Sequence, residues 1–316
     1  MKKKLIKKDQ KLKVIVILGP TASGKTRLAV DLALEFNGEI VSADSRQVYK
    51  GMDIGTGKDL SEYKRGNKKV FYHLIDVASP KRNFDLKRYQ RLANKAILKI
   101  LNHGKLPIIV GGSGLYVQAI VDNYDLPAKT KDKNLRLKLE GLGADKLFKL
   151  ISTKQPDFAK RLNNSDRFNA RRLARYLEII NSDDLIGGQK RPSPFSFLIF
   201  GVDISDDKMR AKIKERLDFR LDKQNMIAEV KKLRKDSLTD KRLINFGLEY
   251  KFITYFLQGK INNNEMRSKL MTASYRFAKR QKTWFRRFEK QGGKINWIKN
   301  KKEAKVQIIK FLKNPA

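Results

Sequence analysis

The sequence predicts an α/β protein whose core is a parallel β-sheet, and three observations support this fold class. Short apolar runs alternate with amphipathic helical segments along the first third of the chain, which is typical of parallel sheets. A glycine-rich motif stands between the first apolar run and the first helical segment. From about residue 129 helical spacing takes over, apart from one further apolar run near residue 200. We therefore expect a sheet core, an α-helical insertion domain and C-terminal helices.

The expected strands are apolar runs rich in Val and Ile, which suit strands buried on both faces. They cover residues 12–18, 39–43, 70–75, 106–110 and 196–202. A first helix is expected over 27–37, ended by Gly38, and an amphipathic helix over 85–103. After Asp206 we expect helices almost to the end of the chain.

Two structural parts are expected. Residues 11–128 and 195–316 would form the α/β catalytic core with the C-terminal helices, and residues 129–194 the helical insertion. Within the insertion, residues 132–180 show helical spacing throughout, and Arg191-Pro-Ser-Pro194 breaks that pattern.

Composition excludes several classes of protein. The 316 residues are 41% hydrophobic, enough for a real core, but no run approaches the roughly 18 apolar residues of a membrane helix. No apolar segment of signal-peptide length follows the basic N-terminus. The absence of cysteine excludes disulfides and thiolate-held zinc, and two distant histidines argue against a histidine-rich metal site. We expect a cytoplasmic protein without membrane contact and, by default, a monomer.

The charge is strongly positive. Lys and Arg number 71 against 33 Asp and Glu, for a net charge of +38. Such a surface attracts polyanions, of which nucleic acid is the usual one. Codon bias of the genome is an alternative source of surface lysines. Because a charge this large carries a cost in self-repulsion, some contact with a polyanion is expected.

The segment Gly19–Thr26, GPTASGKT, matches the phosphate-binding pattern G-x-x-x-x-G-K-[ST] and has a strand before it and a helix after it. Its backbone N–H groups and the helix N-terminus would attract anionic oxygens. Lys25 is expected to meet terminal phosphate oxygens, and the Thr26 hydroxyl to bind Mg²⁺ or a phosphate oxygen. The sheet core is therefore expected to be P-loop NTPase-like. The expected phosphate-binding residues are Gly19, Thr21, Ala22, Ser23, Gly24, Lys25 and Thr26.

Two more strands are expected to end at the same edge of the sheet, where ligands of parallel sheets bind. Asp44 follows one of them, and spacing leaves three roles open for it: Mg²⁺ ligand, general base or helix N-cap. Gly111–Gly114 follows another and offers backbone donors with the Ser113 hydroxyl, although a simple glycine turn is the alternative. For Asp76, a carboxylate in a turn is favoured over a metal ligand. We expect a pocket for a polyphosphate and a second substrate.

Clustered arginines suggest further contacts with phosphates. Arg171 and Arg175 share one helix face, Arg172 points elsewhere, and Arg216 and Arg220 repeat the four-residue spacing. A solvated charged face is the alternative. The segment 278–287 interleaves cations with Trp and Phe, as nucleic-acid-binding segments do, but core positions for Trp284 and Phe285 are favoured.

Taken together, these motifs resemble the tRNA dimethylallyltransferases, the bacterial-type tRNA isopentenyltransferases. The resemblance extends from about Val14 to Arg287 and keeps the family's order of motifs. The segments that carry it are Gly19–Thr26, Asp44–Thr56, His73–Asp76, Pro107–Tyr116 and Ala278–Arg286.

The resemblance implies that the glycine-rich loop holds the diphosphate of dimethylallyl diphosphate and that no phosphoryl group is transferred. N6 of adenosine at tRNA position 37 would attack the allylic carbon, and diphosphate would leave. By the family pattern Asp44 is the general base, while Arg220 and Ser113 contact the diphosphate with Mg²⁺ near Thr26. Ser113 stands where the family usually has Thr.

The resemblance also implies tRNA contacts. Gln47 matches a residue that hydrogen-bonds the target base, and the helical insertion would grip the anticodon stem-loop. The segments that match tRNA-contacting positions are Asp44, Ser45, Arg46, Gln47, Arg171, Arg172 and Arg175. Three other functions are alternatives: an adenylate isopentenyltransferase acting on free nucleotides, a small-molecule kinase, and an RNA-binding protein with a relic phosphate loop. The insertion argues against the first, and the intact Lys25, Thr26 and Asp44 against the last.

Overall fold

The computed structural model describes residues 11–126, 133–181 and 190–314. The chain divides into two compact units, the first formed by Met1–Val121 with Ser193–Ala316 and the second by Asp122–Pro192. Within the described ranges no helix is both long and apolar enough to cross a membrane.

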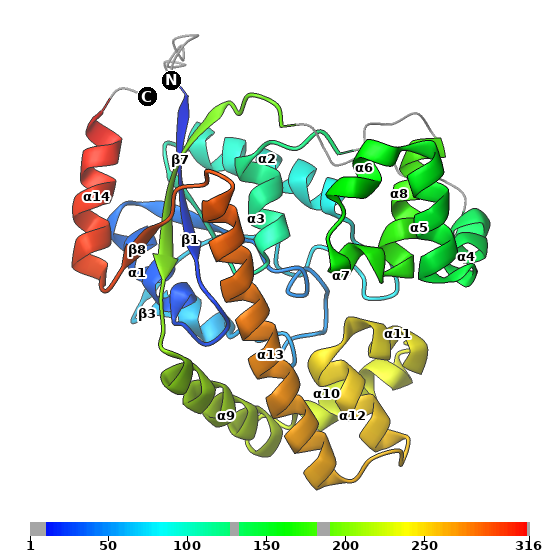
Figure 1. Cartoon of the computed structure of the whole chain (residues 1–316). Helices are drawn as coiled ribbons and strands as arrows, with labels where there is room; N and C mark the ends of the chain where they lie inside the picture. The colour runs from blue at the N-terminus through cyan, green and yellow to red at the C-terminus, as the bar shows by residue number, and fades with distance from the viewer. Residues whose placement is uncertain (1–10, 127–132, 182–189, 315–316) are drawn as a thin grey trace. The chain divides into compact units, whose positions relative to one another are not determined.

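The first unit is built on a six-stranded sheet in the order β5-β2-β6-β1-β7-β8 (Figure 1). Every neighbouring pair of strands in it is parallel, which confirms the predicted fold class. Its strands are β1 Leu12–Leu18, β2 Gly38–Ser42, β5 Tyr72–His73, β6 Leu106–Gly111, β7 Phe195–Val202 and β8 Asn296–Ile298. A separate antiparallel hairpin is formed by β3 Lys64–Arg65 and β4 Lys68–Lys69.

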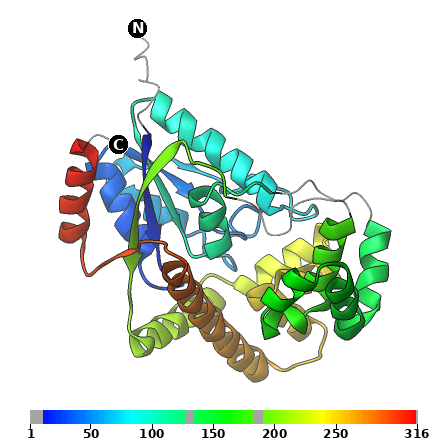
Figure 2. The ribbon, with the colours of Figure 1, turned by 45° about the horizontal axis from the view of Figure 1, so that its top comes forward.

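Both faces of the sheet are covered, because successive side chains of a strand point to opposite faces. Ile15 and Ile17 of β1 pack in one cluster with α1 (Lys25–Glu35) and α14 (Lys301–Lys313). Val14 and Val16 pack in another with α2 (Leu86–Asn102) and α3 (Gly114–Val121). Figure 2 shows these two pairs of helices on the two sides of the sheet. This double burial explains why the strands are continuous apolar runs.

The register of the strands brings three loops to one edge of the sheet. Leu18, the last residue of β1, lies opposite Gly111 of β6 and Gly201 of β7. Ser42, the last residue of β2, lies opposite Val110. The loops after β1, β2 and β6 therefore begin side by side, as expected for the carboxyl ends of neighbouring parallel strands.

A group of helices completes the first unit. The 28-residue helix α13 contacts α3, α9 and α12, and a capping box between Asn262 and Glu265 fixes its start. The helices of the group are α9 Asp206–Asp222, α10 Met226–Lys235, α11 Asp240–Phe246, α12 Leu248–Leu257 and α13 Asn263–Lys290. A short 3₁₀ helix, η1, covers Leu60–Tyr63.

Two predicted stretches differ from the structure. The strand expected over 70–75 is confined to Tyr72–His73. It ends there because Leu74 and Asp76 adopt positive φ angles of 66° and 57°, which end the extended conformation. The all-helical C-terminal stretch expected after Asp206 is interrupted by β8, which pairs with β7 at the edge of the sheet. Three residues are too few to show a strand period.

Helices make up most of the described part of the second unit, and an isolated antiparallel bridge joins Tyr124 to Lys190. A small core of Leu147, Ile151, Leu173 and Leu177 joins its two longest helices. The helices are α4 Lys133–Gly141, α5 Gly143–Lys154, α6 Pro156–Arg161, α7 Asn164–Arg167 and α8 Ala170–Asn181. The insertion predicted for residues 129–194 spans these helices, and its predicted first residue lies outside the described residues, as do residues 127 and 128 of the predicted core.

Candidate active site

The glycine-rich loop connects β1 to the N-terminus of α1. Gly24 takes the N-cap position with φ 83°, a conformation that glycine adopts without strain, and no side chain caps the helix. Within the described ranges, the first turn of α1 therefore keeps N–H groups free of side-chain partners, which suits an anion. The loop is tied down elsewhere, since the Thr21 N–H donates to Oε1 of Gln281 at 2.8 Å.

Three cationic side chains accompany this loop. Lys25 Nζ donates to the Pro20 carbonyl oxygen at 3.2 Å and has no ion-pair partner within 4.0 Å in the described part of the chain. Burial lowers the pKa of Lys25 to about 8, against the opposing effect of Asp44. This ammonium group is thus poorly compensated by the protein itself and is suited to a bound anion.

The other two cations come from α9. Arg216 Nη2 donates to Thr21 Oγ1 at 2.5 Å, while its Nε is buried without a partner among the described residues. Burial, followed by the neighbouring Arg220, lowers the pKa of Arg216 to about 10. Arg220 is buried and pairs with Asp59 at 3.0 Å. Sequence analysis assigned a role only to Arg220, but the structure joins Arg216 directly to the phosphate loop.

Asp44 lies immediately beyond β2. Its Oδ1 accepts the backbone N–H of Arg46 at 2.8 Å and, more weakly, that of Gln47 at 3.4 Å. This contact closes a turn, and no helix begins directly after Asp44. The helix N-cap, one of the three roles left open by the sequence, is therefore wrong. Oδ2 makes no hydrogen bond within the described ranges. One carboxylate oxygen thus orients the group, and the other can accept a proton or bind a cation.

Ser113 holds two of the loops together. Its Oγ accepts the Ser45 N–H at 3.1 Å, and its own N–H donates to the Ala43 carbonyl oxygen at 3.3 Å. The loops after β2 and β6 are therefore joined as a pair. Ser113 does not line the cavity that contains Asp44, so its direct contact here is with the loop of Ser45.

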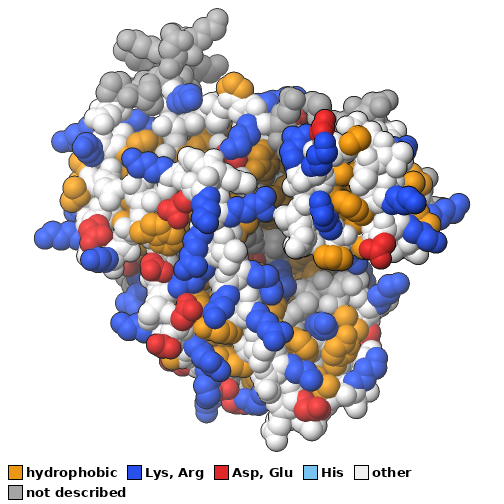
Figure 3. Space-filling view, viewed as in Figure 1, with side chains coloured by type: hydrophobic (Ala, Val, Ile, Leu, Met, Phe, Trp, Pro, Cys, Tyr) orange, Lys and Arg blue, Asp and Glu red, His pale blue; other side chains and the backbone are white. Residues whose placement is uncertain are grey.

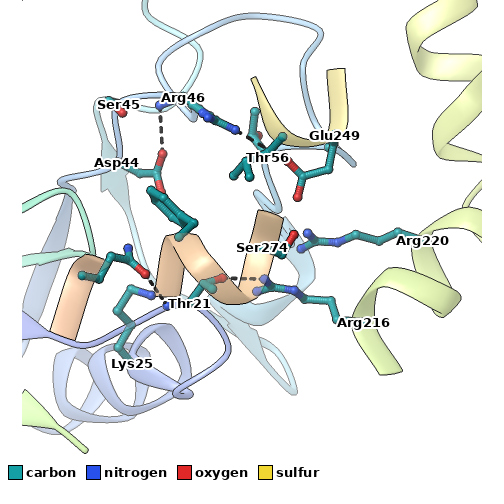
Figure 4. Close-up of a pocket in the computed structure, with 14 residues that line it drawn as sticks. Thr21, Lys25, Asp44, Ser45, Arg46, Thr56, Arg216, Arg220, Glu249 and Ser274 are labelled. Carbon is teal, nitrogen blue, oxygen red and sulfur yellow. Dashed lines mark hydrogen bonds and ion pairs between the residues drawn. The ribbon is translucent and has the colours of Figure 1, made fainter. Parts of the chain in front are cut away.

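These elements enclose a cavity at the edge of the sheet (Figure 4). The loops after β1 and β2 meet α9, α12 and α13 there, together with the segment around Gly55. The residues that line it are Thr21, Lys25, Asp44, Ser45, Arg46, Gly55, Thr56, Arg216, Arg220, Leu248, Glu249, Ser274, Phe277 and Gln281. Cationic groups of the phosphate loop and α9 thus share one cavity with a carboxylate, as expected for a polyphosphate bound beside a second substrate.

Gln281 is a bridging residue that sequence analysis gave no role. Its Oε1 accepts the Thr21 N–H at 2.8 Å, and its Nε2 donates to the Gly112 carbonyl oxygen at 2.9 Å. It therefore connects the phosphate loop to the loop after β6 from helix α13. It lies within the motif 278–286, but nothing in that pattern shows which of its polar residues points inward.

The segment 51–59, which brings Gly55 and Thr56 to the cavity, is fixed from two sides. Glu229 of α10 accepts the N–H groups of residues 53–55 at 2.7, 2.7 and 3.1 Å. The buried Lys58 bridges Asp53 at 2.6 Å and Asp76 at 2.5 Å. Asp76 is therefore a turn carboxylate paired with lysine, as favoured from the sequence.

Gln47 makes two hydrogen bonds with its own surroundings. Its Oε1 accepts from Ser42 Oγ at 3.0 Å, and its Nε2 donates to the Gly57 carbonyl oxygen at 2.9 Å. Its amide thereby links β2 to the segment 51–59. The predicted contact with a base would have to replace or share one of these bonds.

The arginine cluster of α8 lies in the second unit. Arg171 is largely exposed and lies 3.9 Å from Glu140. Arg172 pairs with Asp166 at 2.8 Å, and Arg175 with the buried Glu178 at 3.1 Å. Arg171 thus has the longest of the three ion pairs and is the most available for an external phosphate.

The aromatic residues near the end of α13 pack with the core, which confirms the favoured core position for Phe285, while Trp284 is half-buried against that core. Phe285 is fully buried, and Trp284 stacks on Phe288 at 5.5 Å between ring centroids. A Cβ at Gly114 would lie 2.0 Å from the Trp284 ring, so only glycine fits there.

On the face seen in Figure 3, Lys and Arg side chains are spread widely, including along α13, and outnumber acidic ones.

Comparisons with known proteins match nearly the whole chain. A family model described as IPP transferase matches residues 47–288. The tRNA dimethylallyltransferase 1 of Geotalea daltonii is 42% identical over 300 residues, which are 95% of this chain and 94% of that protein. The crystal structure of the full-length tRNA isopentenylpyrophosphate transferase from Bacillus halodurans is 33% identical, with a TM-score of 0.67 over 96% of both chains. The crystal structure of the tRNA delta(2)-isopentenylpyrophosphate transferase from Staphylococcus epidermidis is 30% identical in sequence. Its TM-score is 0.65, over 95% of this chain and 100% of that one.

Proposed function

The chain belongs to the tRNA dimethylallyltransferase family, and on that premise we propose that it transfers a dimethylallyl group from dimethylallyl diphosphate to N6 of adenosine 37 in tRNA. The observation that carries this proposal is the Asp44 carboxylate, which lines the same cavity as four cationic side chains, Lys25, Arg46, Arg216 and Arg220. Such a cavity can hold an anionic leaving group beside a nucleophile that must lose a proton. The proposal includes a cytoplasmic enzyme that acts as a monomer.

Charge stabilisation is the task of the cationic side. As the bond between the allylic carbon and oxygen breaks, negative charge develops on the diphosphate. Lys25, Arg216 and the N–H groups at the start of α1 would stabilise that charge where it forms. Arg220 lines the same cavity while it pairs with Asp59, and it would add to the positive charge that faces the diphosphate. Because Lys25 has no carboxylate partner of its own among the described residues, its charge remains available to the substrate.

Proton removal is the task of Asp44. The bond between N6 and the allylic carbon forms while N6 carries two hydrogens, one of which must leave. Oδ2 of Asp44 would accept that proton, while Oδ1 keeps the group oriented through the Arg46 N–H. The adenine would have to leave the anticodon-loop stack to reach the cavity, as bases do in base-modifying enzymes.

Mg²⁺ is also part of the proposal. Among the described residues no group of three or more His, Asp or Glu side chains could hold a metal ion. Most oxygen ligands of the ion would therefore come from the diphosphate and from water, as is common for Mg²⁺. The Thr26 hydroxyl makes no hydrogen bond with the described protein and fits as the protein ligand. When bound, the ion would neutralise part of the diphosphate charge.

Replacement of Thr26 by alanine is expected to raise the Mg²⁺ concentration that gives half-maximal diphosphate binding by about tenfold or more, because the protein's own oxygen ligand is lost. Thr26→Ser keeps the hydroxyl and should bind like the wild type. Calorimetric titration of inorganic diphosphate at several Mg²⁺ concentrations measures the effect. An unchanged Mg²⁺ requirement in Thr26→Ala would exclude Thr26 as the ligand.

The anticodon stem-loop is proposed to contact Arg171, Arg172 and Arg175. The log of the tRNA binding constant falls as the log of the salt concentration rises. In Arg171→Gln this negative slope is expected to be shallower by nearly one unit, because one phosphate contact is lost. The control is Lys302→Gln, which removes an exposed cation from α14 and should leave the slope unchanged. Filter binding of unmodified tRNA between low and moderate salt measures both slopes. Equal slopes for Arg171→Gln and the wild type would exclude a phosphate contact by Arg171.

One reaction tests the proposed function. The purified chain would be incubated with Mg²⁺, dimethylallyl diphosphate, unmodified tRNA and AMP, and the digested products read by nucleoside mass. A dimethylallyl gain on tRNA adenosine with AMP unchanged is the expected result. Prenylated AMP would instead assign the enzyme to free nucleotides, and no gain on either would remove dimethylallyl diphosphate as the donor.

A further inference from the structure

A buried hydroxyl on α13 has no hydrogen-bond partner among the residues that the structure describes. Ser274 is 3% exposed and lines the cavity. Its Oγ is buried and makes no hydrogen bond within the described part of the chain. No role was assigned to this residue from the sequence, since a single serine in a long amphipathic helix carries no pattern.

The lack of a partner is unusual for a hydroxyl in a helix. Serine and threonine there commonly donate to the carbonyl oxygen four residues earlier. Thr254 does so in α12, to Tyr250 at 2.6 Å, and Thr283 does so in α13 itself, to Lys279 at 3.1 Å. Ser274 does not, although the same bond would satisfy it. A buried polar group left unpaired costs free energy, so its retention in a cavity indicates an external partner.

The surroundings indicate what kind of partner this is. Arg216 lines the same cavity, and its Nε is a second buried donor without a partner among the described residues. Its Nη2 meanwhile holds the phosphate loop through Thr21. Figure 4 shows Ser274 at the part of the cavity where the Arg216 and Arg220 side chains enter. The carboxylate of Glu249 also lines the cavity, but it faces Arg46 at 3.6 Å.

From these contacts we infer that the Ser274 hydroxyl binds the leaving group, donating a hydrogen bond to a diphosphate oxygen alongside Arg216 Nε. This inference rests on the proposed function, because it requires a diphosphate in the cavity. α13 then contributes to the anion site twice. Gln281 orients the phosphate loop through its backbone, and Ser274 contacts the anion itself.

The test compares Ser274→Ala with the wild type in calorimetric binding of inorganic diphosphate with Mg²⁺. The affinity is expected to fall about tenfold or more, the effect of losing a hydrogen bond to a charged group. Thermal unfolding without diphosphate is expected at the same or a higher temperature, because the change removes an unpaired buried hydroxyl. Ser274→Thr, which keeps the hydroxyl, should restore much of the affinity.

Thr254→Val is the matched control, because it removes a buried hydroxyl that is already hydrogen-bonded within α12. It should lower the unfolding temperature and leave diphosphate affinity unchanged, the opposite of Ser274→Ala. Wild-type affinity in Ser274→Ala, or a change only in KM for tRNA, would overturn the inference while the proposed function stood. If the wild-type chain bound no diphosphate, the proposed function would fail first.

Discussion

Replacement of Asp44 by asparagine is expected to lower the rate of dimethylallyl transfer by about 10²–10⁴-fold, the usual contribution of a general base. Asparagine keeps the shape of the side chain and an oxygen that can accept the Arg46 N–H now bound at 2.8 Å. The turn should therefore persist, and the affinities for tRNA and dimethylallyl diphosphate should change little. Single-turnover rates at saturating substrate, together with filter binding of tRNA, separate the two effects.

The same variant distinguishes the roles that the sequence left open for Asp44. A metal ligand would raise the Mg²⁺ requirement when replaced, whereas a base would lower the rate at every Mg²⁺ concentration. A residue that only caps its turn would leave the rate within a few-fold of the wild type. Asp85→Asn provides the matched control, since Asp85 caps α2 through the Arg88 N–H at 2.8 Å and does not line the cavity.

The parts of the site that follow strands were predictable from the sequence. Parallel strands place their carboxyl ends at one edge, so the loops containing Lys25, Asp44 and Ser113 had to begin close together. The register confirms this, with Leu18 opposite Gly111. The phosphate-binding loop was also predictable, because the glycine-rich motif is preceded by a strand and followed by a helix in the sequence itself.

The residues supplied by distant helices were not predictable. Arg216 meets Thr21 across 195 positions of sequence, and Gln281 meets it across 260. No local period or spacing encodes such contacts, which depend on how α9 and α13 pack on the sheet. Ser274 was hidden for a further reason, since its significance lies in a missing hydrogen bond. Strand β8 was not predicted, because its three residues show no strand period and it is defined by its pairing with β7.

Removal of the Lys25 charge is expected to have a second large effect. Lys25→Met should lower kcat/KM for dimethylallyl diphosphate by about 10²–10³-fold, as does the loss of one group that stabilises a developing anion. Arg27→Met removes an exposed cation from the same turn of α1 and should have little effect. Similar losses in the two variants would mean that general charge near the loop, and not the Lys25 contact, promotes the reaction.

The pH dependence of diphosphate binding separates an effect of the Lys25 charge from an effect of its packing, because only the charge changes with pH. The pKa of Lys25 is lowered to about 8, first by burial, so the amine is neutral above that pH in the absence of an anion. A bound diphosphate favours the ammonium form, and binding above pH 8 must therefore take up a proton. Affinity for inorganic diphosphate should fall as the pH rises through 8 and beyond. The ratio of wild-type to Lys25→Met affinity, in which the titration of diphosphate itself cancels, should be largest below pH 8 and shrink above it. A ratio that stays constant across this range would show that Lys25 acts through packing and not through its charge.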